Sequence, residues 1–237
     1  MTQIPPSQPT NPNDPAPAPK PPAAEAAERR DWPAYFDRME GKPPRETVVE
    51  AITSTPTPGF AIDLGCGDGR DTQELLSHGW RVLAIDGHEE GIQRLKQRPA
   101  CAKALSEGRL TAIVGQFEDI ASGKVPLPET TLLNASFALP FCPPEHFAGL
   151  WAAMDRAVPP GGRFSGQFFG ERDGWAIIED RTHLTRAKVL DLFDGWVLDS
   201  FREEDRPSKI NASPHKHWHL FHIVAKKRPL TSTGDPA

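Results

Sequence analysis

The chain contains 237 residues, of which 38% are hydrophobic and 25% charged, and its formal net charge is −5. That length is sufficient for one α/β domain with a substantial core and is short for two. No run approaches the roughly 18 apolar residues of a membrane-spanning helix, and the N-terminus lacks the basic start and apolar core of a secretory signal. The negative charge argues against a large phosphate-binding surface, so we expect neither a membrane nor a nucleic-acid partner.

The cysteines are few and lie far apart in the sequence. Cys66, Cys101 and Cys142 are odd in number and fit neither a disulfide framework nor a four-ligand zinc site. Their pattern indicates a reducing compartment. We therefore expect a cytoplasmic protein.

Proline is concentrated at the N-terminus, where nine of the 26 prolines fall within the first 22 residues. This segment lacks the apolar side chains that would offset the entropy of an ordered backbone. We therefore expect a disordered arm over residues 1–29, a folded domain over residues 30–228 and a disordered tail over residues 229–237.

Two helices are expected at the start of the domain, within residues 30–53. Four large side chains recur at helical spacing in the first of them, namely Trp32, Tyr35, Phe36 and Met39. A Gly-Lys-Pro-Pro turn ends this helix, and the second covers residues 45–52.

The rest of the domain alternates between strand-like and helix-like segments, as chains that form parallel sheets do. The expected helices cover residues 70–78, 88–96, 144–157 and 184–193. The expected strands cover residues 60–64, 81–85, 110–114, 131–135 and 162–169, followed by an antiparallel pair at 196–201 and 218–225. The pattern predicts an α/β fold with a Rossmann-like, seven-stranded, mainly parallel sheet, helices on both faces and a C-terminal antiparallel hairpin.

The most informative segment is AIDLGCGDGRDT, residues 61–72, in which a strand passes into three closely spaced glycines and then into a helix. Glycine lets the backbone turn sharply and approach a ligand without a Cβ in the way. The helix behind the loop directs N–H groups at it, and Asp71 and Glu74 have capping-box spacing. Such a loop is typical of nucleotide and nucleoside sites.

Two well-known glycine loops fit this segment poorly, whereas a third fits well. A dinucleotide fingerprint, G-x-G-x-x-G, requires glycine where this chain has Arg70, and the phosphate-binding pattern G-x-x-x-x-G-K-[ST] does not occur. The string Asp-Leu-Gly-Cys-Gly-Asp-Gly resembles motif I of the class I S-adenosylmethionine-dependent methyltransferases. The string DLGCGDGRDT and the N-terminal helix pair also resemble the tellurite-resistance methyltransferase group.

This resemblance extends over about residues 32–227 and implies roles for further residues. Asp86 ends the second strand, where a carboxylate accepts both ribose hydroxyl protons of a nucleoside, although it also fits a helix cap. Gln116 replaces an acidic residue that often contacts adenine in the family, and its oxygen can accept the same hydrogen bond. Phe117 would offer its N–H to the ring, although it also fits a core position. The implied cofactor is S-adenosylmethionine, bound by Asp63, Gly65, Cys66, Gly67, Gly69, Arg70, Asp86, Gly87, Gln116, Phe117, Ala135 and Ser136.

The family topology places the substrate between the loops after strands four and five, the lid-like N-terminal helices and the final hairpin. Arg45 fits a carboxylate or oxyanion partner, although a surface charge at a helix start would look the same. Arg172 likewise fits either a substrate contact or a solvated turn. The implied substrate-binding residues are Arg45, Phe141, Arg172, Trp175 and His215.

Histidines cluster in SPHKHWHLFHIVAKK, residues 213–227. In a strand, His217 and His219 share one face of the sheet. Trp218, Leu220 and His222 share the opposite face. The His-x-His spacing is compatible with zinc, but no third ligand has supporting spacing, so we expect no metal. We expect His217 to be the catalytic residue, lying on the cofactor side of the sheet and orienting or deprotonating the substrate.

The sequence thus predicts an enzyme that transfers a methyl group from S-adenosylmethionine to a small-molecule acceptor. The reaction is an in-line displacement with a neutral leaving group, so positioning in a dry site dominates, and a base is needed only for a protonated nucleophile. Two alternatives stay open: a nicotinamide-dependent Rossmann oxidoreductase, which Arg70 disfavours, and a non-catalytic cofactor-binding protein whose Pro-rich arm engages a partner. The sequence identifies neither the acceptor nor the oligomeric state.

Overall fold

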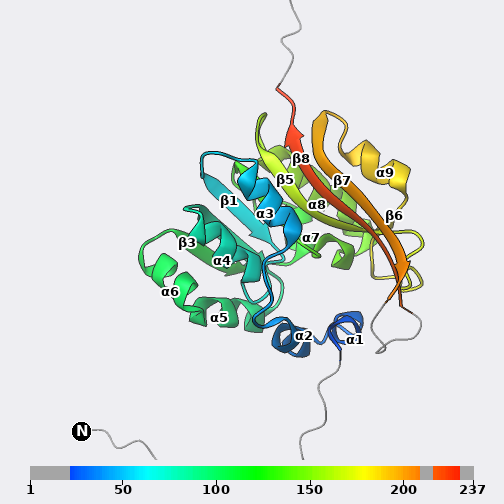
Figure 1. Cartoon of the computed structure of the whole chain (residues 1–237), viewed down its shortest axis with the longest axis horizontal. Helices are drawn as coiled ribbons and strands as arrows, with labels where there is room; N and C mark the ends of the chain where they lie inside the picture. Colours follow the sequence, from blue (N-terminus) through cyan, green and yellow to red (C-terminus); the bar gives the residue numbers. More distant parts are fainter. Residues whose placement is uncertain (1–21, 209–215, 230–237) are drawn as a thin grey trace, which may run out of the picture.

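The computed structural model describes residues 22–208 and 216–229, and a single mixed sheet forms its centre (Figure 1). The strand order is β3-β2-β1-β4-β5-β8-β7. The first five strands pair in parallel, whereas β8 is antiparallel to both β5 and β7. The strands are β1 (Phe60–Leu64), β2 (Arg81–Asp86), β3 (Leu110–Val114), β4 (Leu132–Ala135), β5 (Arg163–Gly170), β7 (Trp196–Pro207) and β8 (His217–Lys227).

The predicted seven-stranded sheet with a C-terminal antiparallel hairpin is therefore confirmed, with one addition. A two-residue strand, β6 (His183–Leu184), pairs in parallel with the end of β5. The helix expected at residues 184–193 consequently begins later, as α9 (Arg186–Leu192), with the Thr185 hydroxyl capping it. The hairpin strands are also longer than expected, because β7 and β8 remain paired as far as Pro207 and His217.

Helices cover both faces of the sheet, as expected from the sequence (Figure 1). Two buried apolar clusters fill the space between sheet and helices, one on each face. One face carries α3 (Glu46–Thr53), α4 (Arg70–Ser77), α5 (Glu89–Gln97) and α6 (Pro99–Ser106). The other carries α7 (Phe117–Ala121), α8 (Pro144–Ala157) and α9. Within the described residues, no helix combines the length and apolar character needed to cross a membrane.

Two local expectations about the helices are wrong. The sequence reading missed α6, in which proline at the first helical position starts a helix directly after α5. The capping box of Asp71 and Glu74 does not form, because Gly69 is the N-cap residue of α4 and Asp71 lies inside the first turn. The Asp71 carboxylate instead accepts a hydrogen bond from the backbone N–H of Arg45, 3.0 Å away, and so joins α4 to the start of α3.

The N-terminal boundary of the folded domain also requires correction. Helix α1 (Ala23–Glu28) lies within the arm that was expected to be disordered over residues 1–29. Its alanines favour a helix, and burial of Ala26 and Ala27 stabilises it against the domain. Helices α1 and α2 (Trp32–Met39) lie together at one end of the sheet, where α2 also contacts α5 (Figure 1). Residues 1–21 of the expected arm and 230–237 of the expected tail lie outside the described residues.

Candidate functional site

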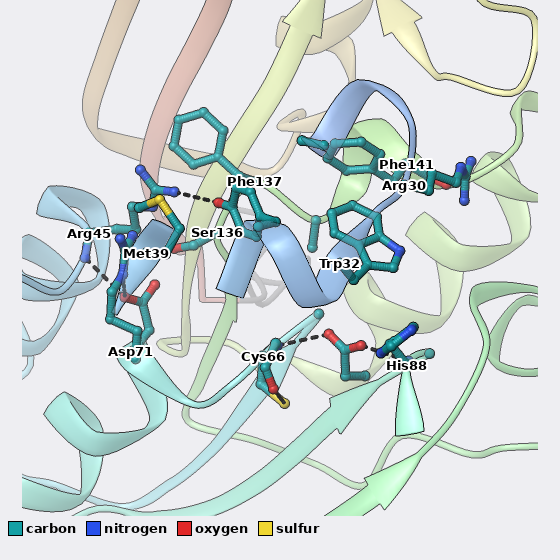
Figure 2. Close-up of a pocket in the computed structure, with 18 of the residues that line it drawn as sticks. Arg30, Trp32, Met39, Arg45, Cys66, Asp71, His88, Ser136, Phe137 and Phe141 are labelled. Atoms are coloured by element: carbon teal, nitrogen blue, oxygen red, sulfur yellow. Dashed lines mark hydrogen bonds and ion pairs between the residues drawn. The ribbon is translucent and has the colours of Figure 1, made fainter. Parts of the chain in front are cut away.

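A cavity of about 630 Å³ opens at the carboxyl ends of the parallel strands, where α/β sheets commonly bind ligands. One end is bounded by the glycine loop after β1, the end of β2 and the loop after β3. The other end is bounded by α1, α2, the loop after β4 and the hairpin strands. Figure 2 shows labelled residues from both ends, with the N-terminal helix segment crossing between them.

The glycine loop is fixed by contacts inside the protein as well as by its own geometry. Gly65 adopts a φ of +69°, and its N–H donates to the Ile85 carbonyl at 2.7 Å. A Cβ on Gly65 would overlap the Cβ of Ala138, and one on Gly69 would lie 2.7 Å from Leu95 Cγ. Gly65, Cys66 and Gly67 line the cavity, whereas Gly69 does not. The glycines therefore serve close packing of the loop in addition to any ligand.

Asp86 lies at the end of β2 and connects the glycine loop to α5. Its carboxylate accepts the backbone N–H of Gly67 at 2.8 Å and that of His88 at 2.7 Å. Burial raises the pKa of this carboxyl above its ordinary value. Asp86, Gly87 and His88 all line the cavity, and the buried His88 Nδ1 has no hydrogen-bond partner among the described residues. This end of the cavity therefore offers both a carboxylate and an unsatisfied ring nitrogen.

A buried polar network holds Asp63 beneath the cavity. Thr72 donates its hydroxyl to Asp63 at 2.5 Å, and Asn134 donates its amide at 2.9 Å. Asn134 also accepts hydrogen bonds from Ser136 and Ser165. Burial, reinforced by the Asp71 charge, raises the pKa of Asp63 to about 7. Asp63 is therefore an acidic group whose charge state responds to a cation in the cavity.

Two guanidinium groups line the cavity near this network. Arg45 donates to the Tyr35 hydroxyl at 3.0 Å and lies over the Phe137 ring, with Cζ 4.2 Å from the ring centre. Burial, followed by repulsion from Arg45, lowers the pKa of Arg70, and its ion pair with Asp71 is long, at 3.7 Å. Two neighbouring cations that repel one another in a partly buried site favour the binding of an anion.

The loop after β3 contributes Gln116 and Phe117, as predicted, and both residues line the cavity. Gln116 donates its side-chain amide to the Gly87 carbonyl at 2.8 Å, which ties this loop to the end of β2. Phe117 begins α7 and packs against the core on the face that this helix covers.

The loop after β4 places Ser136 at the cavity but not Ala135, which is fully buried and absent from the lining. The next residue, Phe137, has a φ of +52°, a conformation that is costly for a residue with a Cβ. The buried Gln167 side chain accepts the Phe137 N–H at 2.8 Å and donates to Thr47 at 2.8 Å. These bonds hold Phe137 in its strained conformation, facing the cavity.

Aromatic side chains dominate the end of the cavity farther from the glycine loop. The Trp32 and Phe141 rings meet edge to face, with centres 4.9 Å apart, and Figure 2 shows them side by side. Trp175 and Trp218 are 5.5 Å apart, and each also contacts Phe169. The predicted contacts Phe141 and Trp175 thus lie at the cavity. This third apolar cluster is separate from the two that lie between the sheet and its helices.

Besides Gly69 and Ala135, the predicted residues His217 and Arg172 do not line the cavity. The neighbours Trp218, Leu220 and His222 face it, and because side chains alternate along a strand, His217 faces away. Its imidazole pairs with Asp205 at 2.5 Å and is 38% exposed. Arg172 likewise pairs with Glu203 and Asp205, outside the cavity. These positions correct the expectations for His217 and Arg172.

His215 lies outside the described residues. His219 lies on the same face as His217, and its side chain is within 4.8 Å of Glu203 and Asp205, a grouping that could hold a metal ion. The Arg172 guanidinium already contacts all three of these side chains. An internal cation therefore already occupies this cluster, and we assign no metal to it.

Several cavity residues were missed by the sequence reading. Among those that extend the predicted set are Arg30, Trp32, Asp71, His88, Phe137, Glu204, Arg206, Trp218 and His222. The alternation along β8 did group Trp218 with His222, but it gave no sign of which face the cavity occupies. Nothing in the sequence around Phe137 indicated that it would face the cavity, because its conformation depends on Gln167, 30 residues later.

Comparison with known proteins agrees with this geometry. Residues 61–162 match the family described as a methyltransferase domain. The trans-aconitate 2-methyltransferase of Acidovorax sp. (strain JS42) is 31% identical over 136 residues, which are 56% of this chain and 47% of that protein. The chain thus spans about half the length of the curated relatives it matches.

Two solved structures share the fold. TehB from Haemophilus influenzae has a TM-score of 0.67 at 16% identity, over 82% of this chain and 66% of the other. The 1,6-didemethyltoxoflavin-N1-methyltransferase of Burkholderia thailandensis, solved with bound 1,6-didemethyltoxoflavin and S-adenosylhomocysteine, has a TM-score of 0.60 at 17% identity, over 91% of this chain and 94% of the other. The fold is therefore shared with these two proteins, and the methyltransferase-domain match covers residues 61–162, less than half of the chain.

Proposed function

We propose that this protein transfers a methyl group from S-adenosylmethionine to a small-molecule acceptor. One observation supports this most strongly: a single cavity connects the polar pocket of the glycine loop to an aromatic pocket beneath the N-terminal helices. A cofactor bound at the first pocket would present its reactive end toward a second molecule in the other. The domain match and the named small-molecule methyltransferases support the same conclusion.

The residues of the polar pocket fit the parts of this cofactor. Asp86 provides an acceptor for ribose hydroxyls, and Gln116 and Phe117 adjoin the space for the base. Asp63 offers a carboxylate to the ammonium group, whereas the Arg45 and Arg70 guanidiniums offer partners for a carboxylate. The orphaned Nδ1 of His88 is a further polar atom that a ligand would satisfy.

The bound cofactor supplies an electrophilic methyl group on a sulfonium, and the protein supplies position and dryness. Helices α1 and α2 cover the cavity with Ala27, Trp32 and Tyr35, and these side chains exclude water from the reacting atoms. The strained Phe137 and its neighbour Ser136 border the space between the two pockets. Holding both reactants in line within this enclosure provides most of the rate enhancement.

The cellular setting is part of the same proposal. Cys66, Cys101 and Cys142 are all unpaired and buried, which supports a reducing, cytoplasmic location. Burial raises the pKa of the Cys101 thiol to about 11 and that of Cys142 to about 12, so both stay protonated and inert. We expect a small-molecule acceptor rather than nucleic acid, in keeping with a cavity of about 630 Å³ and the net charge of −5.

Calorimetric titration tests the proposal directly, with S-adenosylmethionine, S-adenosylhomocysteine and NAD as separate ligands. We expect both sulfur nucleosides to bind and NAD not to bind. Replacing Asp86 by Ala removes the ribose acceptor and two loop hydrogen bonds, so the affinity for S-adenosylhomocysteine should fall about 100-fold.

The matched control is Asp199→Ala, which removes a carboxylate of β7 that pairs with Arg163 away from the cavity. Its affinity for S-adenosylhomocysteine should match that of the wild type. Binding of NAD alone would instead favour the oxidoreductase alternative. Binding of the cofactor without product in a screen of thiols, amines, carboxylates, oxyanions and phenols would favour the non-catalytic alternative.

A further inference from the structure

The aromatic end of the cavity has a composition that selects among acceptors. Its rings come from separate segments of the chain and form an apolar cluster that is only partly covered, with Trp32 and Trp218 half-buried. Such a surface binds a flat ring by stacking and edge contacts. A ligand of this shape would bury the apolar area that the cluster leaves exposed to the cavity.

The charges around these rings are already paired, which disfavours an ionic acceptor. Arg206 pairs with Glu204 at 2.8 Å, and Arg30 pairs with Asp180 at 3.0 Å. The Lys216 ammonium lies 3.7 Å from the Trp175 ring centre and 4.2 Å from that of Trp218. A cation of the protein therefore already occupies the position between these tryptophans where a cationic ligand would bind.

His222 is the one imidazole of the described residues that lines this end of the cavity. Its Nε2 is buried and has no hydrogen-bond partner in the described part of the chain, although the Glu204 carboxylate lies 3.5 Å away. On β8 it shares a face with Leu220 and Trp218, and its ring lies 6.1 Å from that of Phe137. An unsatisfied nitrogen beside an apolar pocket provides an acceptor for a polar hydrogen on a ligand.

We propose that the methyl acceptor is a flat aromatic or heteroaromatic molecule with an O–H or N–H group, and that the His222 imidazole takes the proton of that group. This inference rests on the proposed function. The acceptor oxygen or nitrogen forms a bond to the methyl carbon, and the carbon–sulfur bond breaks with its electron pair passing to sulfur. The acceptor proton moves to His222 and later to water, while the nearby Glu204 carboxylate stabilises the imidazolium.

The electrostatic surroundings keep His222 neutral before the reaction. Burial, followed by the positive charge of Arg202 on β7, lowers the pKa of the imidazole, whereas Glu204 of β7 and Glu46 of α3 oppose this effect. A further cation, Arg45, lies over the Phe137 ring, which is itself a neighbour of His222. Because the pKa is below that of an ordinary histidine, kcat at saturating S-adenosylmethionine should stay constant on acidification to below pH 6.5 and then fall.

Binding of coumarins to the chain loaded with S-adenosylhomocysteine tests the inference without turnover. We expect 7-hydroxycoumarin and 7-methoxycoumarin to bind and trans-aconitate not to compete. The hydroxyl compound should bind about fivefold more tightly, because only it donates a hydrogen bond to His222. His222→Phe should remove this preference, and Trp218→Leu should weaken both coumarins about tenfold. His78→Gln, at the exposed end of α4, should leave all affinities unchanged.

Turnover with S-adenosylmethionine then tests proton transfer. His222→Gln keeps an acceptor atom but cannot act as a base, so it should methylate 7-hydroxycoumarin about 100-fold more slowly than the wild type. The more acidic 3-cyano-7-hydroxycoumarin arrives already ionised, and its rate should change much less. Equal slowing of both compounds would overturn the role of His222, as would loss of the rate in His217→Gln instead.

The outcomes separate this inference from the proposed function. If S-adenosylhomocysteine binds but the coumarins do not, or if the wild type leaves bound 7-hydroxycoumarin unmethylated, the aromatic acceptor is wrong and the cofactor assignment stands. If trans-aconitate binds in their place, the acceptor is a carboxylate. If S-adenosylhomocysteine itself fails to bind, the proposed function is wrong.

Discussion

The two ends of the cavity are built in different ways. The cofactor end consists largely of one contiguous segment, residues 61–72, with Asp86 and Gln116 added from the next two strands. The acceptor end collects single side chains from α1, α2, the loop after β4, the end of β5 and the two hairpin strands. A short motif can therefore specify the first end, whereas no continuous stretch of sequence specifies the second.

The two ends also differ in their physical chemistry. Several carboxylates line the cofactor end, and the oxygens of Asp63, Asp71 and Asp86 accept hydrogen bonds from backbone and side-chain donors. The acceptor end is a cluster of rings whose neighbouring charges are neutralised inside the protein. The cofactor end thus suits a charged, polar ligand held by directed bonds, and the acceptor end suits a flat, apolar one.

The strongest expected disruption of the cofactor end is Gly65→Ala. The new Cβ combines a φ of +69° with overlap of Ala138, so unfolding in urea should show a loss of about 3 kcal/mol and calorimetry a loss of cofactor binding. Gly108→Ala is the matched control, because its φ is +68° and no atom lies within 4 Å of the added Cβ. The control should lose only about 1 kcal/mol and keep full affinity. Equal losses in the two variants would show that backbone strain alone is responsible.

An effect of intermediate size is expected when stability and cofactor affinity are measured against pH, which tests the charge of Asp63 at the cofactor end. The pKa of Asp63 is about 7 in the folded chain and 3.8 ordinarily, so the native state holds a proton that the unfolded chain releases. Stability should therefore fall as the pH rises from about 4 to 7, and affinity for the cationic S-adenosylmethionine should rise through about pH 7. Asp63→Asn should flatten both dependences. A rise in affinity that persists in this variant would assign the titration to another group.

The smallest effect is expected outside the cavity, at Arg172. Its half-exposed guanidinium makes ion pairs with Glu203 and Asp205 that water can replace. Arg172→Ala should change Tm by no more than about 2 °C and leave the affinities for S-adenosylhomocysteine and 7-hydroxycoumarin unchanged. A selective loss of coumarin affinity would instead support the substrate contact of Arg172 predicted from the sequence, and would indicate that the acceptor binds closer to β7.

Elements that depend on residues close together in the sequence were predicted correctly, whereas those that depend on distant residues were not. Strands β1 and β3 and helix α8 have the predicted bounds, because each is set by a local run of apolar side chains or by helical periodicity. The boundary at α1 was missed, since its alanines become ordered only when Ala26 and Ala27 are buried against the rest of the domain. The wrong capping box at Asp71 has a similar cause, because its carboxylate binds the N–H of Arg45, 26 residues earlier.

The sequence by itself predicted the mainly parallel sheet with its C-terminal hairpin, the glycine loop and, through a family resemblance, the proposed cofactor, because these depend on short motifs and on the alternation of strands and helices. Only the tertiary structure decided which face of β8 meets the cavity, and so placed His222 rather than His217 in its lining. A strand pattern defines two faces without saying which of them the neighbouring elements leave open. That choice is made by the packing of α1, α2 and the β4 loop around the end of the sheet.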